Sequence, residues 1–404
     1  MTQACAQARA EDVARAAYGK LLAMLASRTG DIAAAEDALS EAFLAALRTW
    51  PTRGVPDSPE AWLLTAAKNR RIDQARKDAR LVVTNEVPEM TDVFVPDLDE
   101  TLDERLKLLF VCAHPAIDVA IRTPLMLQTV LGLEAEQIAR AFLVSPTAMA
   151  QRLVRAKKKI KSAGIPFAIP DVASLPDRMA SVLEAVYGAY AVDWLEGAGD
   201  LSHEAFFLST ILADLVPKDP EALGLTALIG FIEARRDARV HENMLVPVPD
   251  QDTDLWDMAM IERSANMLSR AATLGKTGRF QLEAAIQSVH AARSATGQTD
   301  WRALSQLYAG LVKLHPTIGA VVGRAAVTVE DAGPAEALKL LAKIEGPETD
   351  RYQPYHATHA HCLSRLGRIA EAAAAYDKAV SLCTDLPSRR WLAQKVAELR
   401  QNIS

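Results

Sequence analysis

Residues 132–160, GLEAEQIARAFLVSPTAMAQRLVRAKKKI, form the most informative stretch of the chain. The segment LEAEQIARAFL predicts a short helix, and a tight turn follows it at 143–144. Ser145 is a favourable N-cap for a second helix, and Pro146 suits the first position of that helix. Two short helices joined by a turn of about three to four residues, the second one cationic, are typical of a helix-turn-helix.

The second helix of this pair has one apolar face and one basic face. Its apolar residues recur at helical spacing and are expected to be buried: Met149, Leu153, Ala156 and Ile160. A helix in the major groove places N-terminal side chains on base edges and flanking cations on phosphates. The contacts predicted near its N-terminus are Ser145, Thr147, Ala148, Gln151, Arg152 and Arg155. The predicted phosphate contacts are Lys157, Lys158, Lys159 and Lys161.

Two further helices are predicted upstream, on either side of the loop PTRGVPDS (51–58). Asp31 is a suitable N-cap for the first of them, which is expected to end at Trp50. Helical spacing predicts its buried face as Ala38, Leu39, Ala42, Phe43, Ala46 and Leu47. Its outer side is left with Asp37, Ser40, Glu41 and Ala45. Ser58 and Pro59 predict the start of the second helix, whose second half is rich in lysine and arginine.

The rest of the chain consists of a linker and a long helical tail. The linker, 81–104, is acidic and contains two prolines, which predicts an extended tether. After Pro170 the chain shows amphipathic helices separated by Gly, Pro and Asp turns. The segment YHATHAHCLSRLGRIAEAAAAYDKAVSLC (355–383) fits the second half of a tetratricopeptide (TPR) pattern, and GPAEALKLLAKIEG (333–346) looks like another second helix.

Composition supports an all-α protein with little or no sheet. Half of the 404 residues are apolar, only 5% are aromatic, and β-branched runs are scarce. The net charge of -6 arises in the tail, whereas basic and acidic residues nearly balance up to Ala168. The four cysteines are far apart, which predicts a reducing, cytoplasmic compartment. The longest apolar stretch, 223–232, is too short to cross a membrane and predicts a buried helix.

Three motifs in this order resemble an RNA polymerase sigma factor of the extracytoplasmic-function (ECF) group. AEDALSEAFLAAL (35–47) resembles the part of sigma region 2 that binds the polymerase clamp. AWLLTAAKNRRIDQARK (61–77) resembles the region 2 helix that meets the minus-10 promoter element. Residues 132–160 are similar to region 4, which reads the minus-35 element. The tail resembles the subgroup in which a TPR-type extension is fused to the sigma core.

The resemblance assigns roles to the two upstream helices. It implies that the first helix docks on the β′ clamp of core polymerase through Asp37, Leu39, Glu41, Ala42 and Phe43. An ordinary amphipathic helix would instead bury Leu39, Ala42 and Phe43. The second helix would contact the minus-10 element through Lys68, Asn69, Arg70, Arg71, Asp73, Arg76, Lys77 and Arg80. The alternative for these residues is a solvated basic face, and Trp62 is expected in the core.

The resemblance also implies a domain plan: region 2 at 9–80, a flexible linker at 81–104, region 4 at 105–167 and a regulatory domain at 171–404. The protein would bind the β′ and β subunits of core polymerase, recognise promoter DNA and start transcription of a restricted regulon. The tail is expected to contact the sigma core and to offer a groove to a protein partner. Leu143 and Ala150 depart from the residues usual in region 4, glycine and often lysine, which puts the turn geometry and the base contacts in question.

Other functions have less support in the sequence. A stand-alone helix-turn-helix regulator would not need the region 2 motif, and a TPR scaffold would not need the basic residues of both DNA-facing helices. Asp250, Asp252 and Asp254 resemble the start of a calcium loop, but Leu255 stands where glycine is required. A cluster of three histidines, His356, His359 and His361, is more consistent with packing than with a metal site. No enzyme, no cofactor and no metal are expected.

Overall fold

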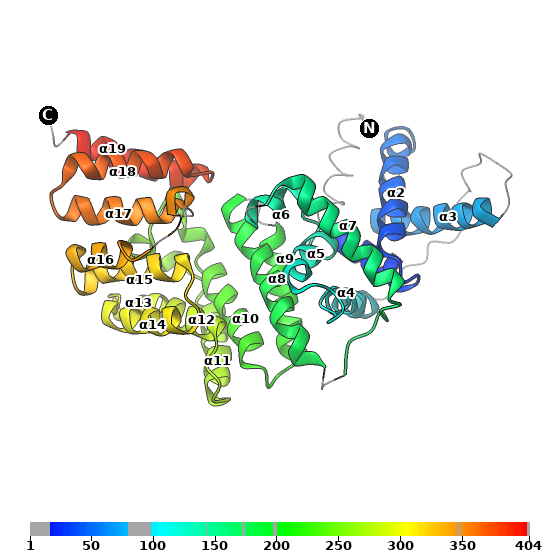
Figure 1. The fold of residues 1–404 in the computed structure, drawn as a ribbon, viewed down its shortest axis with the longest axis horizontal. Helices are drawn as coiled ribbons and strands as arrows, with labels where there is room; N and C mark the ends of the chain where they lie inside the picture. Colours follow the sequence, from blue (N-terminus) through cyan, green and yellow to red (C-terminus); the bar gives the residue numbers. More distant parts are fainter. Residues whose placement is uncertain are drawn as a thin grey trace. The chain divides into compact units, whose positions relative to one another are not determined.

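The computed structural model describes residues 17–79, 98–142, 144–171, 174–196, 200–344, 346 and 349–401, without the side chains of 71–79, 98–103, 193–196 and 200. In this part of the chain almost every element is a helix, as the sequence predicts (Figure 1). The helices form two compact units. The first consists of 1–192 with 199–204, and the second of 193–198 with 205–404.

In its described residues, the first unit contains two helical blocks and one long helix after them. The first block, residues 17–79, has a helix through 17–27, then α2 (Ile32–Arg53) and α3 (Pro59–Ala79). The second block, residues 98–171, contains four helices: α4 (Leu98–Cys112), α5 (Val119–Thr129), α6 (Ala135–Ala141) and α7 (Pro146–Ser162). Helix α8 (Leu175–Glu196) follows, and α9 (Asp200–Leu215) leads into the second unit.

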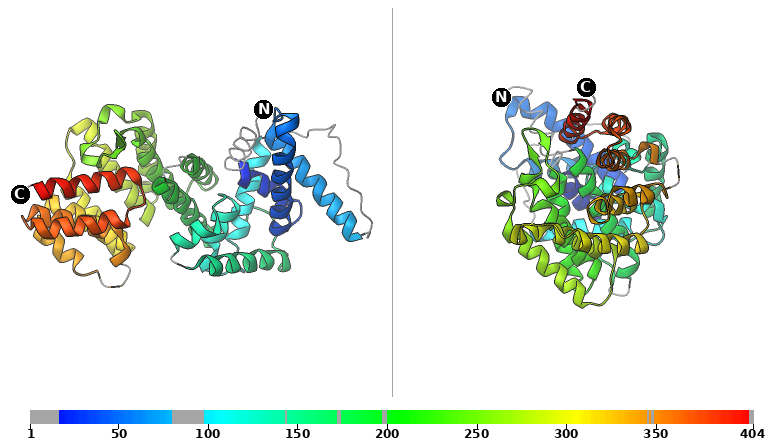
Figure 2. Two further views of the ribbon diagram at one scale, coloured as in Figure 1. Left: turned by 90° about the horizontal axis from the view of Figure 1, so that it is seen from above. Right: turned by 90° about the vertical axis from the view of Figure 1, so that its left-hand side faces the viewer.

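The second unit continues with α10 (Pro220–Glu233) and a short irregular segment before the remaining helices. That segment holds η1 (Arg236–Ala238), η2 (Val248–Asp250), η3 (Thr253–Leu255) and a hairpin of β1 (Val240–His241) with β2 (Met244–Leu245), paired antiparallel. The helices that follow are α11 (Met258–Thr273), α12 (Arg279–Ala291), α13 (Arg293–Thr296), α14 (Trp301–Leu314), α15 (Ile318–Asp331), α16 (Pro334–Leu341), α17 (Gln353–Arg365), α18 (Ile369–Leu382) and α19 (Leu386–Gln401), with η4 (Thr349–Arg351) before α17. From α14 to α19 each helix packs on the next. Figure 2 shows these helices, coloured from yellow to red, from two further directions.

The start signals in the sequence act as predicted. The Asp31 carboxylate accepts a hydrogen bond from the backbone N–H of Ala34 at 3.1 Å and caps α2. The Ser145 hydroxyl accepts one from the Ala148 N–H at 3.3 Å, and Pro146 is the first residue of α7. The first N–H groups of a helix have no acceptor within the helix, so each cap provides a hydrogen-bond acceptor for a donor that would otherwise lack one.

Two predicted boundaries are wrong. Helix α2 does not stop at Trp50 but runs through Pro51 to Arg53, and the N–H of Gly54 closes it on the Trp50 carbonyl at 3.0 Å. Gly54 has a φ of +88°, so a residue without a Cβ is needed to end the helix there. The predicted tether is already helical from Leu98, in a stretch of acidic residues that suits a helix N-terminus. The tether's residues before position 98 lie outside the described part of the chain.

The core of the first block forms around two tryptophans. Trp50 is buried, and its ring meets that of Trp62 edge to face at 5.7 Å between centroids. Such pairs add about 0.5–1.5 kcal/mol beyond the area they bury. Two residues of the predicted apolar face are not buried: Leu47 is 37% exposed, and Phe43 is only partly buried.

Helix α8 extends the first unit beyond the predicted domain boundary at about 170. Arg178 donates from Nη1 to the carbonyl oxygen of Phe110 at 3.1 Å, and Gly188 lies against the side chain of Leu127. Both partners belong to the second block, where Leu127 is 1% exposed. The first helix after the basic helix α7 therefore packs with the N-terminal blocks.

The apolar stretch 223–232 lies in α10, which is buried on nearly all sides, as predicted. Within the described residues, no helix is long and apolar enough to cross a membrane.

Candidate polymerase and DNA surfaces

The outer face of α2 combines two acids with two exposed leucines. Asp37, Ser40, Glu41, Leu44, Leu47 and Arg48 are exposed and recur every three or four residues, so they share one side of the helix. Leu44 is 52% exposed and Leu47 is 37% exposed. Large apolar side chains that are exposed side by side are typical of interaction surfaces. The sequence assigned Leu47 to the core and did not single out Leu44.

The polymerase contacts predicted on α2 divide into two groups. Asp37 and Glu41 are exposed and Phe43 is partly buried, so these three can reach a partner. Leu39 and Ala42 have no exposed surface, and their prediction as contacts is therefore wrong. Both belong to the core of the first block, because each lies on the side of α2 that is turned inward.

The basic part of α3 is only partly described. Arg70 is exposed and lies 3.6 Å from Glu41, while Lys68 and Asn69 are half-buried. Burial and, next, the nearby Arg28 lower the pKa of Lys68. The side chains of Arg71, Asp73, Arg76 and Lys77 lie outside the described part, and so does Arg80 altogether.

Helices α6 and α7 form the predicted pair, with residues 142–145 between them. The N-terminus of α6 carries a capping box, in which the Gln137 side chain accepts from the Glu134 N–H at 2.9 Å. Four predicted apolar residues of α7 are buried, as expected: Met149, Leu153, Ala156 and Ile160. The predicted turn residue Leu143 lies outside the described residues.

The outer face of α7 is cationic. Its exposed residues from the predicted set are Ser145, Thr147, Gln151, Arg152, Arg155, Lys158, Lys159 and Lys161, and Ala148 is partly buried. The helix contains no Asp or Glu, so no charge on it offsets this basic face. A surface of this kind provides salt-sensitive affinity for phosphates.

Lys157 does not belong to that surface. Its side chain is 7% exposed, and its Nζ lies 2.5 Å from a Glu36 carboxylate oxygen and 3.0 Å from the Gln128 amide oxygen. The prediction that Lys157 contacts phosphate is therefore wrong for this conformation. The prediction fails because the residue spacing within α7 does not reveal that α2 packs against this side of α7.

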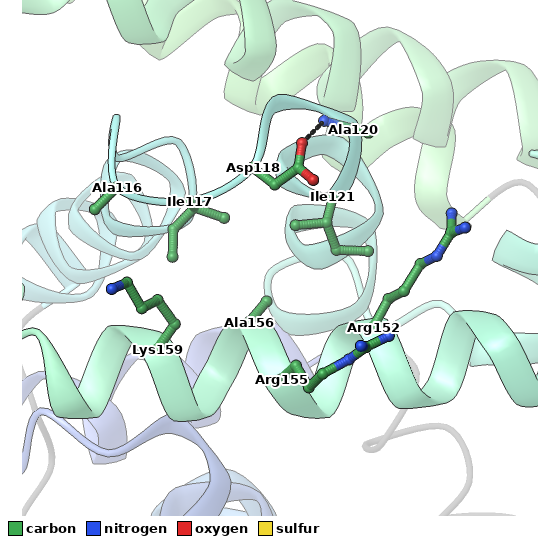
Figure 3. A pocket seen from close by; sticks show the side chains of 9 residues that line it. All are labelled: Ala116, Ile117, Asp118, Ala120, Ile121, Arg152, Arg155, Ala156 and Lys159. Carbon is green, nitrogen blue, oxygen red and sulfur yellow. Dashed lines mark hydrogen bonds between the residues drawn. The ribbon is translucent and has the colours of Figure 1, made fainter.

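A cavity of about 480 Å³ lies beside the basic face of α7 (Figure 3). Three cations, Arg152, Arg155 and Lys159, line it on one side, and the loop before α5 lines the other. Asp118 in that loop accepts a hydrogen bond from the Ala120 N–H at 3.0 Å and caps α5. The sequence did not indicate this cavity, because its two walls are more than thirty positions apart.

The three histidines near the C-terminus take part in packing and polar contacts. His359 stacks on Tyr355 with 6.0 Å between ring centroids, and His356 meets the same ring edge-on at 5.3 Å. His361 lies 3.6 Å from Glu330. Among the described residues, no group of three or more His, Cys, Asp or Glu side chains is arranged to hold a metal ion.

Comparisons with known proteins found a match to sigma-70 factors in the part of the chain that contains α2 and α3. Sigma-70 region 2 matches residues 13–81, and a family of unknown function, DUF6596, matches residues 178–272. An uncharacterized protein of Rhizobium meliloti (strain 1021) is 36% identical over 385 residues, which cover 90% of each chain. The chain therefore belongs to one family with this Rhizobium protein, and its residues 13–81 match region 2 of sigma-70 factors.

Proposed function

We propose that this protein is an ECF-type sigma factor that binds core RNA polymerase through α2 and directs it to the promoters of a restricted regulon. Helix α3 would contact the minus-10 element and α7 the minus-35 element. The catalytic chemistry would belong to the polymerase, so the chain itself needs no cofactor. A cytoplasmic location follows from this role.

The outer face of α2 carries the proposal. It presents Leu44 and Leu47 next to the acidic residues Asp37 and Glu41, in the segment that matches sigma-70 region 2. Exposed leucines are unfavourable in water unless a partner covers them, since burial of such a side chain gains about 1.5–3 kcal/mol. A regulator that binds only DNA has no use for this face. It therefore favours a sigma factor over a stand-alone helix-turn-helix regulator.

The experiment that tests the proposal is reconstitution with bacterial core polymerase. The purified chain is expected to co-elute with core polymerase and to direct run-off transcription from the promoter region upstream of its own gene. Salt-sensitive binding to duplex DNA without core binding would instead support a stand-alone regulator. If the chain binds neither core polymerase nor duplex DNA, the TPR scaffold is the interpretation that would be supported.

The basic face of α7 predicts how minus-35 binding depends on salt. Replacement of Lys158 and Lys159, which are exposed, by alanine is expected to lower affinity for a minus-35 duplex at least about tenfold. The slope of log K against log salt should become shallower by about 2, because each lost phosphate contact releases one counterion fewer. Titration at several salt concentrations measures both quantities.

The matched control for this experiment removes the same charge elsewhere. Arg263 and Arg270 are exposed on α11, in the second unit. Replacement of both arginines by alanine should leave the slope of log K against log salt unchanged. A slope that changes equally in both double variants would mean that net charge, and not the face of α7, determines binding.

We propose further that the C-terminal extension, with its TPR-like helices, regulates the sigma core through intramolecular contact and binds a protein partner in a groove. The contacts of α8, the first helix of the extension, with Phe110 and Leu127 of the second block support the intramolecular part, and the shortened chain below retains them, so it tests the rest of the extension. The test is run-off transcription by a chain that ends after Glu204 and so keeps the first unit. A change in activity or regulation is expected, and identical behaviour of the two chains would contradict the proposal.

A further inference from the structure

A cluster of buried polar side chains lies in the second unit, where α12 and α13 meet the irregular segment that follows α10. At its centre is the ring of Trp256, which comes directly after η3 and is 5% exposed. The guanidinium carbon of Arg293 lies 5.0 Å from the ring centroid, and that of Arg235 lies 5.8 Å from it. Gln251 is also 5% exposed, and its backbone carbonyl accepts a hydrogen bond from Arg293. These residues therefore form one cluster, although α11 separates Arg293 from the others along the chain.

Arg293 is held by neutral groups alone. Its Nη2 donates to the backbone carbonyl oxygens of Val248, at 3.2 Å, and of Gln251, and its guanidinium lies over the Trp256 ring. Within the described residues, none of its partners carries a negative charge. The nearby guanidinium of Arg235 adds a second positive charge. Because charges away from bulk water are paired with opposite charges in folded proteins, Arg293 favours an anion beside it.

Buried polar atoms of this cluster lack a hydrogen-bond partner among the described residues. They include Nε of Arg293, Nε1 of Trp256, Nδ1 of His290 and Oε1 of Gln251. His290 of α12 belongs to the cluster because the charges of Arg235 and Arg293 contribute, after burial, to its lowered pKa. Protein groups, water or a bound ion satisfy nearly all such atoms in folded proteins. Water supplies hydrogen bonds but no negative charge, so it leaves Arg293 uncompensated.

The unpartnered atoms define the chemistry of the group that fits. Arg293 Nε and Trp256 Nε1 are donors, so they require an acceptor such as an oxyanion oxygen. Gln251 requires a donor, because its amide nitrogen already donates to the Val246 carbonyl at 3.2 Å and its free end is therefore the oxygen. The group that satisfies all three carries negatively charged oxygens and at least one O–H.

We propose that this cluster is a binding site for a small oxyanion that keeps a hydroxyl proton, such as hydrogen phosphate or a short hydroxycarboxylate. Arg293 and Trp256 donate to its oxygens, and Gln251 accepts from its hydroxyl group. Solvent reaches the cluster at Arg293 and His290, which are both only half-buried. A bound anion joins α12 and α13 to the irregular segment, so it stabilises the second unit.

The test is thermal unfolding of the full chain at pH 7 in two matched pairs of anions at equal ionic strength. Phosphate and sulfate share a tetrahedral shape, and both stabilise folded proteins because they are excluded from protein surfaces. Only phosphate keeps an O–H group at this pH, and lactate likewise carries the hydroxyl group that acetate lacks. We expect phosphate or lactate to raise the Tm of the second unit above that in its matched anion, by about 5 °C or more at about 100 times Kd. The rise should saturate with concentration, and the pair that shows it identifies the class of ligand.

Trp256→Phe isolates one of the two donors. It keeps an aromatic ring beside both guanidinium groups but removes the indole N–H, so the Kd for the anion should rise at least about tenfold. The matched control is Trp391→Phe on α19, which makes the same change elsewhere in the second unit and should bind the anion as the parent chain does. Arg293→Lys is a second variant that keeps the charge and loses the Nε donor. It should weaken binding too, and it replaces Trp256→Phe if that variant does not fold.

Two results would overturn the proposal. Equal Tm values within each pair of anions would show that water alone satisfies the buried atoms. A preference for one anion that stays unchanged in both Trp256→Phe and Arg293→Lys would show that the anion binds elsewhere. The site does not rest on the proposed sigma function, so these measurements stand whether or not the chain binds core polymerase.

Discussion

Replacement of both Leu44 and Leu47 by aspartate is expected to weaken binding of core polymerase by about 100-fold or more, because each central apolar contact of an interface contributes more than about 1 kcal/mol and each buried aspartate adds the cost of an unpaired charge. Both leucines are exposed on α2, so the substitutions should leave the fold of the first block intact. Competition for core polymerase against a labelled reference sigma factor measures the loss.

The control is Leu314→Asp, at a leucine that is 50% exposed on α14 in the second unit. It introduces the same side chain at a similar exposure and should bind core polymerase like the parent chain. Full affinity in the Leu44/Leu47 double variant would show that polymerase binds another surface, and the proposed role of α2 would be wrong.

Protonation of His290 is expected to lower the free energy of unfolding of the second unit by about 3 kcal/mol as the pH falls from 7 to 4. This figure follows from the difference between the pKa values of the unfolded and folded states, at about 1.4 kcal/mol per pKa unit. His290 lies on α12, with its ring edge-on to Trp301 at 6.4 Å. Burial and then the charges of Arg235 and Arg293 lower the pKa of His290 to about 4. Both arginines also lie over the ring of Trp256, at 5.8 and 5.0 Å.

The direction of this pH dependence follows from the protonation of His290 in the folded and unfolded states. In the unfolded chain the histidine takes up its proton near pH 6.5, whereas in the folded chain it does so only near pH 4. Acid therefore favours the unfolded state throughout this interval, and above pH 6.5 the full contribution to stability is present.

Urea denaturation at pH 7 and pH 4.5 tests this expectation on the full chain. His290→Gln removes the titrating group and should reduce the difference between the two pH values. His241→Gln changes a histidine whose side chain is 81% exposed on β1, and it should leave the difference as in the parent chain. Equal pH dependence of the His290 variant and the parent would contradict the assignment to His290.

Local signals in the sequence predict local structure well in this chain. Asp31, Ser145 and Pro146 mark helix starts because a cap depends on residues within three positions of it. Helical spacing identifies the four buried apolar residues of α7 for the same reason, because all four lie on one face of a single helix. Region 2 was recognised because its motif is contiguous along two neighbouring helices.

Contacts between distant segments could not be predicted in this way. Lys157 lies on the basic side of α7 by its spacing, yet Glu36, more than a hundred positions earlier, brings it into the interior. Leu47 fits the apolar pattern of α2 but lies at the margin of its buried face, where packing with α3 no longer covers it. Likewise, nothing in the sequence of α8 indicates that it packs on α4 and α5.

The packing of α8 also constrains how this protein can change during evolution. Leu127 is 1% exposed and lies against Gly188, so removal of everything after residue 170 would uncover an apolar surface on the second block. Such a surface promotes aggregation. A shortened gene would need compensating polar substitutions on α4 and α5 before it could spread. We therefore expect descendants of this protein to retain α8 even where the rest of the extension has been lost or exchanged.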